Sequence, residues 1–312
     1  MAMKTGIASF GVDVCKDFLD ISDGQRVERI ANTEVELRRF LRRIAGTARF
    51  AVEPTQRYQQ RLVSAALDLG HTVYLVDAYR LSRYREAIGL RAKTDARDAE
   101  LLHRYLMAEA ARLRAYRPPP KAVQTLRELL AARARLTVAK GSIDQALREI
   151  GPLADTRRSV MARLTAAITR IDQQLTRCLA DAGYAADSRR CQGVPGIGPL
   201  NATALVASYH RYRFASADAF VAFLGLDLRV RESGRYRGQR KLSKRGDPEV
   251  RRLLFNAARA GARTEQWRAY YQRLRERGLS TTAAYVALSR KLARIAFALL
   301  RDQTEYRRTI AA

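Results

Sequence analysis

Cysteine is scarce in this chain of 312 residues: Cys15, Cys178 and Cys191 are the only three, and they lie far apart. Three distant cysteines form neither a disulfide framework nor a zinc-ligand motif, and a reducing cytoplasm is the expected compartment. The sequence has no run of eighteen or more uncharged apolar residues, so no membrane span is expected. The N-terminus lacks the apolar core and the small-residue cleavage site of a secretory signal peptide.

Lysine and acidic residues are few in comparison with arginine. Only eight of the 58 basic residues are lysine, and 31 acidic residues leave a net charge of +27. Residues 1–116 carry 20 basic and 15 acidic residues, whereas residues 117–312 carry 38 and 16. A chain this basic is expected to bind a polyanion, and arginine binds phosphate in a two-point geometry. Nucleic acid is the expected partner, because no basic amphipathic segment indicates binding to an anionic membrane.

The first 116 residues alternate between strand and helix patterns. Asp23-Gly24 is a hairpin signal between two strands, and Gly70 is expected to end a helix. Three strands come first and helices separate the later ones, which is the order of an α/β RNase H-like (RuvC-like) domain. A flavodoxin-like sheet would need helices between the early strands, where there is no room. The predicted strands are 5–14, 18–22, 26–30, 49–53 and 72–76, and the predicted helices are 33–44, 58–69, 81–88 and 95–111.

The remaining residues have mainly helical patterns. Arg117-Pro118-Pro119-Pro120 predicts a stiff linker. Residues 121–182 keep one apolar stripe that Gly151-Pro152 interrupts, which predicts an antiparallel, coiled-coil-like hairpin. A spacer and a pairing surface for a second protomer both explain this stripe. We therefore expect three domains, which are 1–116, 117–188 and a mainly α domain at 189–312, with helices at 200–208, 248–264, 265–277 and 280–300 and a loop or short hairpin at 229–240.

Four acidic residues lie where they can share one site. Asp13 lies in the first predicted strand, Glu53 ends the fourth, and Asp95 and Asp98 open a predicted helix with both side chains on one face. Crowded carboxylates repel one another unless a cation intervenes. Mg²⁺ prefers hard oxygen ligands of this kind, and Mn²⁺ is the alternative. Each acid alone also has a structural explanation, such as the helix dipole for Asp95, so the prediction of a metal site depends on all four.

A Pro-Gly-Ile-Gly turn precedes the predicted helix 200–208 and resembles a helix-hairpin-helix element. Gly196 and Gly198 would let the backbone approach a phosphate, and the start of the helix supplies N–H donors. An ordinary tight turn is the alternative. His71, His103 and His210 have no metal-like spacing, and Trp267 is expected to pack between helices rather than to stack on a base.

The densest basic segment, 229–263, has twelve basic and three acidic residues. Ser243 lies within it. Its chemistry alone predicts one more hydroxyl in contact with phosphate, because a serine nucleophile needs an activating partner and the sequence identifies none. The candidate nucleic-acid contacts in this segment are Arg235, Arg237, Arg240, Lys241, Lys244 and Arg245.

Motifs in both halves of the chain resemble the DEDD-type insertion-sequence transposases of the insertion sequence 110 family. In the first half they are Gly11-Val12-Asp13-Val14-Cys15-Lys16, Val52-Glu53-Pro54-Thr55 and Lys93-Thr94-Asp95-Ala96-Arg97-Asp98-Ala99. In the second half they run from Phe214 through Phe223-Leu224-Gly225-Leu226 to Ser243-Lys244-Arg245-Gly246-Asp247 and Arg251-Arg252-Leu253-Leu254. Cys15 and Pro54 depart from residues common in the family, but neither is a ligand.

This resemblance implies specific roles for five residues. Asp13, Glu53, Asp95 and Asp98 would be the D, E, D and D that bind Mg²⁺, and Ser243 would attack DNA to form a covalent phosphoserine link. The family cleaves and rejoins strands to excise and insert an insertion sequence, guided by an RNA that the element encodes. A homo-oligomer, dimer or tetramer, is implied, acting in the bacterial cytoplasm at the nucleoid.

Two alternative functions would each explain some of these sequence features. A RuvC-like structure-specific nuclease would hydrolyse DNA with water, would need the four acids and would not need Ser243. A non-catalytic DNA-binding protein would use the basic residues and the glycine turn but would have no use for four clustered acids.

Overall fold

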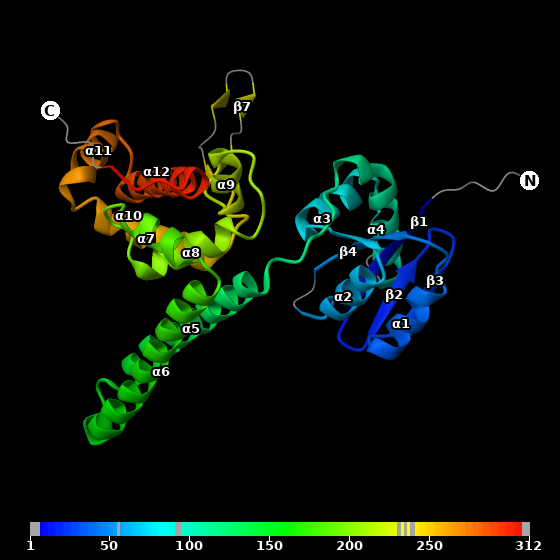
Figure 1. Ribbon diagram of the computed structural model, residues 1–312, viewed down its shortest axis with the longest axis horizontal. Coiled ribbons are helices and arrows are strands. Elements are labelled where there is room, and N and C mark those ends of the chain that lie inside the picture. Colours follow the sequence, from blue (N-terminus) through cyan, green and yellow to red (C-terminus); the bar gives the residue numbers. More distant parts are fainter. Residues whose placement is uncertain are drawn as a thin grey trace, which may run out of the picture. The chain divides into compact units, whose positions relative to one another are not determined.

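The structure is a computed structural model that describes residues 7–54, 57–90, 95–229, 232–233, 236–237 and 241–307. The chain divides into two compact units, Met1–Pro118 and Pro119–Ala312 (Figure 1). Each unit has a hydrophobic core of its own. None of the helices in the described residues is long and apolar enough to cross a membrane.

A five-stranded sheet in the order β3-β2-β1-β4-β5 forms the centre of the first unit. β1, β2 and β3 pair antiparallel, whereas β4 pairs parallel with both β1 and β5. The predicted α/β class is confirmed, and this strand order is consistent with an RNase H-like domain. The strands are β1 Ala8–Val14, β2 Phe18–Ser22, β3 Val27–Ala31, β4 Ala48–Val52 and β5 Thr72–Leu75.

Helices cover both faces of this sheet, and the alternation along each strand decides which side chains meet them. Val12 and Val14 of β1 join the core formed with α1 and α2, and Gly11 and Asp13 point to the opposite face, where α4 packs. α3 begins before the predicted Leu81, because the Asp77 side chain caps it by accepting the Arg80 N–H at 3.1 Å. The helices are α1 Glu34–Arg42, α2 Gln60–Asp68, α3 Ala78–Ala87 and α4 Asp95–Glu109.

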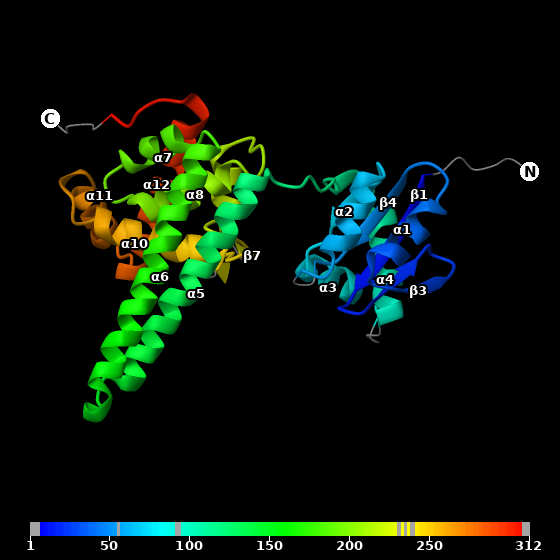
Figure 2. The same cartoon turned by 60° about the horizontal axis from the view of Figure 1, so that its bottom comes forward.

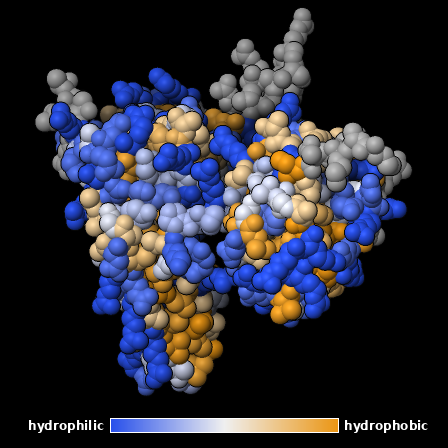
Figure 3. Space-filling view, turned by 45° about the vertical axis from the view of Figure 1, so that its right-hand side comes forward, coloured by the Kyte–Doolittle hydropathy of each residue, from blue (hydrophilic) through white to orange (hydrophobic). Residues whose placement is uncertain are grey.

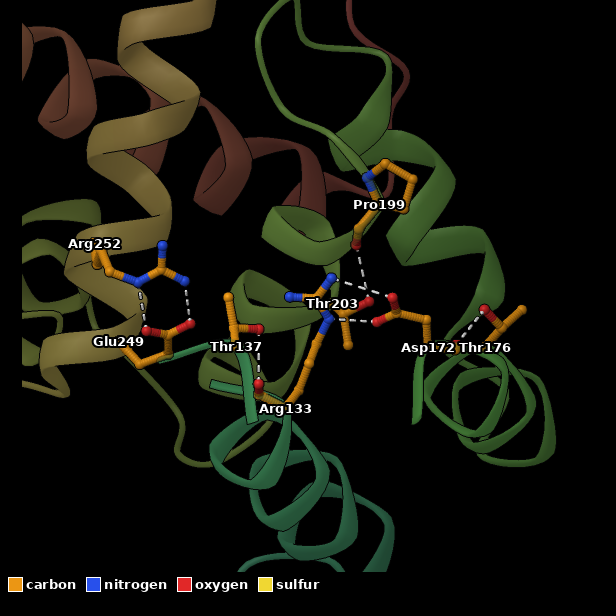
Figure 4. Close-up of polar contacts among 8 residues, drawn as sticks. All are labelled: Arg133, Thr137, Asp172, Thr176, Pro199, Thr203, Glu249 and Arg252. Atoms are coloured by element: carbon orange, nitrogen blue, oxygen red, sulfur yellow. Dashed lines mark hydrogen bonds and ion pairs between the residues drawn. The ribbon is translucent and has the colours of Figure 1, made fainter. Parts of the chain in front are cut away.

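The second unit begins with the helical hairpin that the sequence predicts. α5 Lys121–Leu147 and α6 Ala154–Asp181 lie side by side in both ribbon views (Figure 1, Figure 2). Polar contacts fix their antiparallel register: Arg133 binds both carboxylate oxygens of Asp172, at 2.5 and 3.1 Å, as Figure 4 shows. Two turns further from the rest of the unit, Lys140 donates to Thr165 at 2.7 Å.

The hairpin shares its core with the helices that follow it. Leu126 and Leu130 of α5 and Leu175 and Leu179 of α6 are buried in the core of the second unit, so the hairpin and residues 189–312 form one compact unit. Beyond these leucines the apolar stripe is less covered. Val138 is 72% exposed, and Figure 3 shows hydrophobic surface running down one side of the projecting hairpin.

The C-terminal helices surround α8, whose residues Ala202 to Ser208 are all buried. Trp267 packs between helices, as predicted: it is 4% exposed and its Nε1 donates to the Pro195 carbonyl at 2.9 Å. Of the predicted loop or short hairpin at 229–240, the structure has the hairpin form, with two short antiparallel pairs, β6 Leu228–Arg229 with β9 Lys241–Leu242 and β7 Glu232–Ser233 with β8 Tyr236–Arg237. The helices are α7 Ala185–Gln192, α8 Pro199–Tyr209, α9 Ala217–Phe223, α10 Pro248–Gly261, α11 Glu265–Glu276 and α12 Thr281–Asp302.

Candidate active site

A row of charged side chains crosses the sheet of the first unit at one level. Asp13 pairs with Asp20 between β1 and β2, and Asp20 pairs with Arg29 between β2 and β3. On the other side of β1, Val12 pairs with Val52, so Glu53 follows at the level of Asp13. Side chains at paired positions of a sheet lie on the same face. Arg29, Asp20, Asp13 and Glu53 therefore all belong to the face that α4 covers.

Helix α4 lies very close to this face because Gly11 has no side chain. A Cβ atom at Gly11 would overlap the carbonyl oxygen of Ala99 and the amide of His103, both in the backbone of α4. The first turn of α4 carries Asp95 and Asp98. Its close approach to β1 brings this pair of acids to the level of Asp13, two residues beyond Gly11.

The electrostatics of Asp13 show that the four predicted acids share one environment. The pKa of Asp13 is raised from 3.8 to about 6, mainly by burial and then by the charges of Asp98, Asp95 and Glu53, against a lowering hydrogen bond from the Val14 backbone. Like charges that cannot be separated favour the protonated form of one of them. The site is thus short of positive charge around Asp13.

Two arginines that the sequence analysis missed bind acids of this group. Arg85 of α3 pairs with Asp98, and both side chains are largely buried. Arg29 binds both oxygens of Asp20 at 2.7 Å and lies 3.9 Å from Asp95. The described residues include no three His, Cys, Asp or Glu side chains arranged to hold a metal ion as they stand. The charges of Asp98, Asp95 and Glu53 all act on Asp13, and the Asp98 carboxylate is paired with Arg85.

Ser243 of the second unit has a partner that the sequence did not identify. Its hydroxyl donates a hydrogen bond to Oδ1 of Asp227, and its backbone N–H donates to the Asp227 carbonyl at 2.9 Å. The pairing of β6 with β9 explains this contact. Leu228 pairs with Leu242, so Asp227 and Ser243, one residue further along each segment, lie opposite each other. Both side chains are half-buried.

The turn after Ser243 is held by close backbone packing. A Cβ atom at Gly246 would overlap the carbonyl groups of Phe223 and Leu224, so the two chain segments touch directly. Arg251 donates to the Gly246 carbonyl from the first turn of α10. Lys244 has a φ of 56°, a left-handed conformation that costs a residue with a side chain about 1–2 kcal/mol. This conformation turns the Arg245 N–H back to within 3.4 Å of the Ser243 hydroxyl oxygen.

The basic side chains near this turn fall into two groups. Lys241, Lys244 and Arg245 are exposed, whereas Arg252 is bound by Glu249 through two contacts of 2.7 and 2.6 Å, visible in Figure 4. Beside the turn lies a pocket of about 520 Å³, lined among others by Arg127, Arg211, Tyr212, Phe223 and Arg245. Among the other candidate contacts, Arg235 and Arg240 lie outside the described residues, as does the side chain of Arg237.

The turn between α7 and α8 contains the two glycines predicted to contact phosphate, Gly196 and Gly198. The first of them, Gly196, has a packing role. Gly196, with a φ of 96°, lies against α10: a Cβ atom there would be 2.6 Å from the Ala257 carbonyl oxygen and 2.7 Å from Gly261. Glycine is needed there for the close contact of this turn with α10. Gly198 has open space around it and precedes α8 without a side-chain cap, so the prediction of phosphate contact fits Gly198 better than Gly196.

Comparisons with known proteins match two different parts of the chain to transposase families. A transposase family model of the DEDD type matches residues 10–150, and a second model, described as "Transposase IS116/IS110/IS902 family", matches residues 188–272. Together they span the carboxylates and Ser243.

Three curated relatives are similar to different extents of the chain. A "Probable family 20 transposase" of Pseudomonas aeruginosa is 36% identical over 166 residues, which are 51% of this chain and 47% of the relative. A "Pilin gene-inverting protein" of Moraxella lacunata is 26% identical over 85% of this chain and 83% of its own length. A "Transposase for insertion sequence element IS1111A" of Coxiella burnetii is 37% identical over 132 residues, 39% of this chain and 35% of the relative. The chain thus spans about half of the first of these relatives and most of the second. With two family models matched in order along it, this chain belongs to the IS110 family of DEDD transposases.

Proposed function

We propose that this chain excises and inserts an insertion sequence by cleaving and rejoining DNA strands, with Ser243 as the nucleophile and Mg²⁺ bound by Asp13, Glu53, Asp95 and Asp98. The observation that carries the proposal is the combination, in one chain, of four carboxylates acting on one another and a serine whose hydroxyl is held by a carboxylate. A nuclease that uses water needs only the first of these. A DNA-binding protein needs neither.

The donor set of the first unit suits Mg²⁺, or Mn²⁺ as the alternative. All four proposed ligands supply carboxylate oxygens, and the pKa of Asp13 is raised by burial and by the charges of Asp98, Asp95 and Glu53, which a divalent cation would offset. Asp98 would have to leave Arg85 to join the ion. A bound Mg²⁺ would supply Lewis-acid stabilisation of the oxygens of a reacting phosphodiester.

The partners follow from the charge and the family. DNA is the substrate, and we propose that an RNA encoded by the element selects the sites. Residues 117–312 carry 38 basic against 16 acidic residues and would hold most of the nucleic acid. Lys241, Lys244, Arg245 and the open turn at Gly198 are the proposed contacts, together with Arg235, Arg237 and Arg240. We further propose a dimer or tetramer, supported by the exposed apolar stripe on α5 and α6 near Val138.

The test is recombination by the protein expressed with the non-coding RNA that flanks its gene, on a plasmid that carries the two element ends and a target. Wild-type protein should leave a protein–DNA adduct that resists denaturation. Ser243→Ala should lose the adduct and the recombinant product and still bind nucleic acid, and Asp13→Ala should lose strand cleavage. Cleavage by Ser243→Ala at the wild-type rate would favour the hydrolytic nuclease instead, and binding without cleavage by the wild type would favour a DNA-binding protein.

A further inference from the structure

The carboxylate of Asp227 is the nearest described acid to the Ser243 hydroxyl and contacts it directly. The hydroxyl is the donor in this hydrogen bond, since Oδ1 of an ionised aspartate can only accept. A hydroxyl that donates its proton to a carboxylate keeps a lone pair on its oxygen for an electrophile, here with the Arg245 N–H 3.4 Å from that oxygen. This is the arrangement that general-base activation of a serine requires.

The backbone fixes this contact from both sides. β6 and β9 hold Asp227 and Ser243 as a cross-strand pair, and the Ser243 N–H binds the Asp227 carbonyl at 2.9 Å. Gly246 packs on Leu224, which anchors the segments that precede Asp227 and follow Ser243. A pair held by so many backbone contacts can keep its geometry while DNA binds, which is what catalysis by positioning demands.

Positive charge surrounds the pair. Asp227 acts electrostatically on Arg290 of α12, and so do Arg294 and Asp218. The Nε of Arg290 is buried and has no hydrogen-bond partner among the described residues, whereas Arg294 is bound to Asp218. Lys244 and Arg245 follow Ser243 directly and are exposed. These cations would attract an incoming phosphate.

From this geometry we infer that Asp227 is the general base for Ser243 in DNA cleavage, an inference that depends on the proposed function of Ser243. As Oγ forms its bond to phosphorus, the hydroxyl proton passes to Asp227. The bond from phosphorus to the leaving deoxyribose oxygen breaks, and that oxygen takes up a proton from water. In rejoining, a deoxyribose hydroxyl attacks the phosphoserine and gives its proton to solvent, the bond from phosphorus to Oγ breaks, and the departing Oγ recovers its proton from Asp227.

The test compares Asp227→Asn with wild type in the adduct assay described above, across pH 6 to 9. Asparagine keeps the size of the side chain and can still accept a hydrogen bond, but it cannot take the proton. The adduct should form about 10²–10⁴ times more slowly, the usual contribution of a general base. Its rate should rise about tenfold per pH unit as hydroxide replaces the base, whereas the wild-type rate should stay nearly level above pH 6. Asp218→Asn, which removes a carboxylate that acts on Arg290 and is bound to Arg294, is the matched control and should react at the wild-type rate.

The outcomes distinguish the inference about Asp227 from the proposed role of Ser243 as nucleophile. An Asp227→Asn protein that forms adduct at the wild-type rate overturns the inference alone. So does one that is equally slow at every pH and melts at a lower temperature, because that pattern marks a structural role. If Ser243→Ala itself recombines normally, the function proposed for Ser243 is wrong, whatever Asp227 does.

Discussion

Arg85 of α3 holds the carboxylate of Asp98 in an ion pair whose side chains are only 19% and 9% exposed. Asp98 is one of the four acids proposed to bind metal, so Arg85 and a divalent cation would compete for the same oxygens. Removing one member of a buried pair leaves an uncompensated charge and costs about 3–5 kcal/mol. The arginine thus stabilises the unit when no cation is bound.

Replacing Arg85 should therefore destabilise the metal-free protein and increase its stabilisation by Mg²⁺. We expect Arg85→Met to lower the melting temperature of the metal-free protein, because Asp98 then loses its ion pair with Arg85. Added Mg²⁺ should raise the melting temperature of this variant by more than it raises that of the wild type. Arg83→Met is the control, since Arg83 of the same helix is 61% exposed and pairs with exposed Glu86. An equal Mg²⁺ response in the variant and the wild type would contradict competition at Asp98.

The pKa of Asp13 predicts an unusual pH dependence. A carboxyl with a pKa of about 6 in the folded protein and 3.8 when unfolded binds its proton more tightly in the folded state. Its contribution to the free energy of unfolding is therefore favourable at low pH and is lost as the pH rises from about 4 to about 6. Because Mg²⁺ would offset the uncompensated charge, it should stabilise the protein more at pH 7.5 than at pH 5.

Thermal melts of the wild type and Asp13→Asn at the two pH values, with and without Mg²⁺, check this expectation. Asparagine carries no charge at either pH, so the difference in Mg²⁺ response between pH 5 and pH 7.5 should shrink in the variant. A wild-type response to Mg²⁺ that is the same at both pH values would count against a metal site at Asp13.

Gly11 is expected to be as important for the site as the acids themselves. A side chain there would overlap the backbone of α4 at Ala99 and His103. Gly11→Ala should lower the free energy of unfolding by about 1–3 kcal/mol, the usual cost of overpacking, and should slow DNA cleavage by moving Asp98 from Asp13. Gly141→Ala in α5 is the matched control: it has open space around it and should stabilise the protein by about 1 kcal/mol. Cleavage by Gly11→Ala at the wild-type rate would show that the approach of α4 does not position the acids.

Much of the first unit could be predicted from the sequence because each local signal agreed with the fold. The Asp23-Gly24 turn and the strict alternation in β1 placed Asp13 correctly on a strand. The ion pair of Arg85 with Asp98 could not be predicted, because it joins two helices whose packing depends on tertiary contacts. Even the convergence of the acids required the backbone contact at Gly11, which no periodicity reveals.

The second unit was harder to predict at its candidate site. The sequence predicts a loop or short hairpin at 229–240, but β6 and β9 have two residues each, too few for an alternating pattern that would fix the register and place Asp227 beside Ser243. The role of the glycine turn could be predicted only in part. A glycine at position 196 is expected both where the backbone approaches a phosphate and where it packs against a helix such as α10, and the sequence does not distinguish the two.

Lys244 offers a prediction in which stability and binding change in opposite directions. Its left-handed backbone should cost about 1–2 kcal/mol in a residue with a side chain, and its ammonium group is proposed to contact phosphate. Lys244→Gly should therefore raise the melting temperature and weaken nucleic-acid binding. The slope of log affinity against log salt concentration should also become less steep by about one unit, which corresponds to the loss of one phosphate contact. Lys244→Asn, which tolerates the left-handed region, should lose the same contact with a smaller gain in stability.

Lys244→Arg separates the two effects, because it keeps both the charge and the strain. Its melting temperature and salt slope should match those of the wild type. Binding to a DNA duplex and to single-stranded RNA, measured from 50 to 300 mM salt alongside thermal melts, gives both quantities for each variant. If Lys244→Gly binds with the wild-type salt slope, the Lys244 side chain does not contact phosphate. The strained conformation would then serve only to bring the Arg245 N–H towards the Ser243 oxygen.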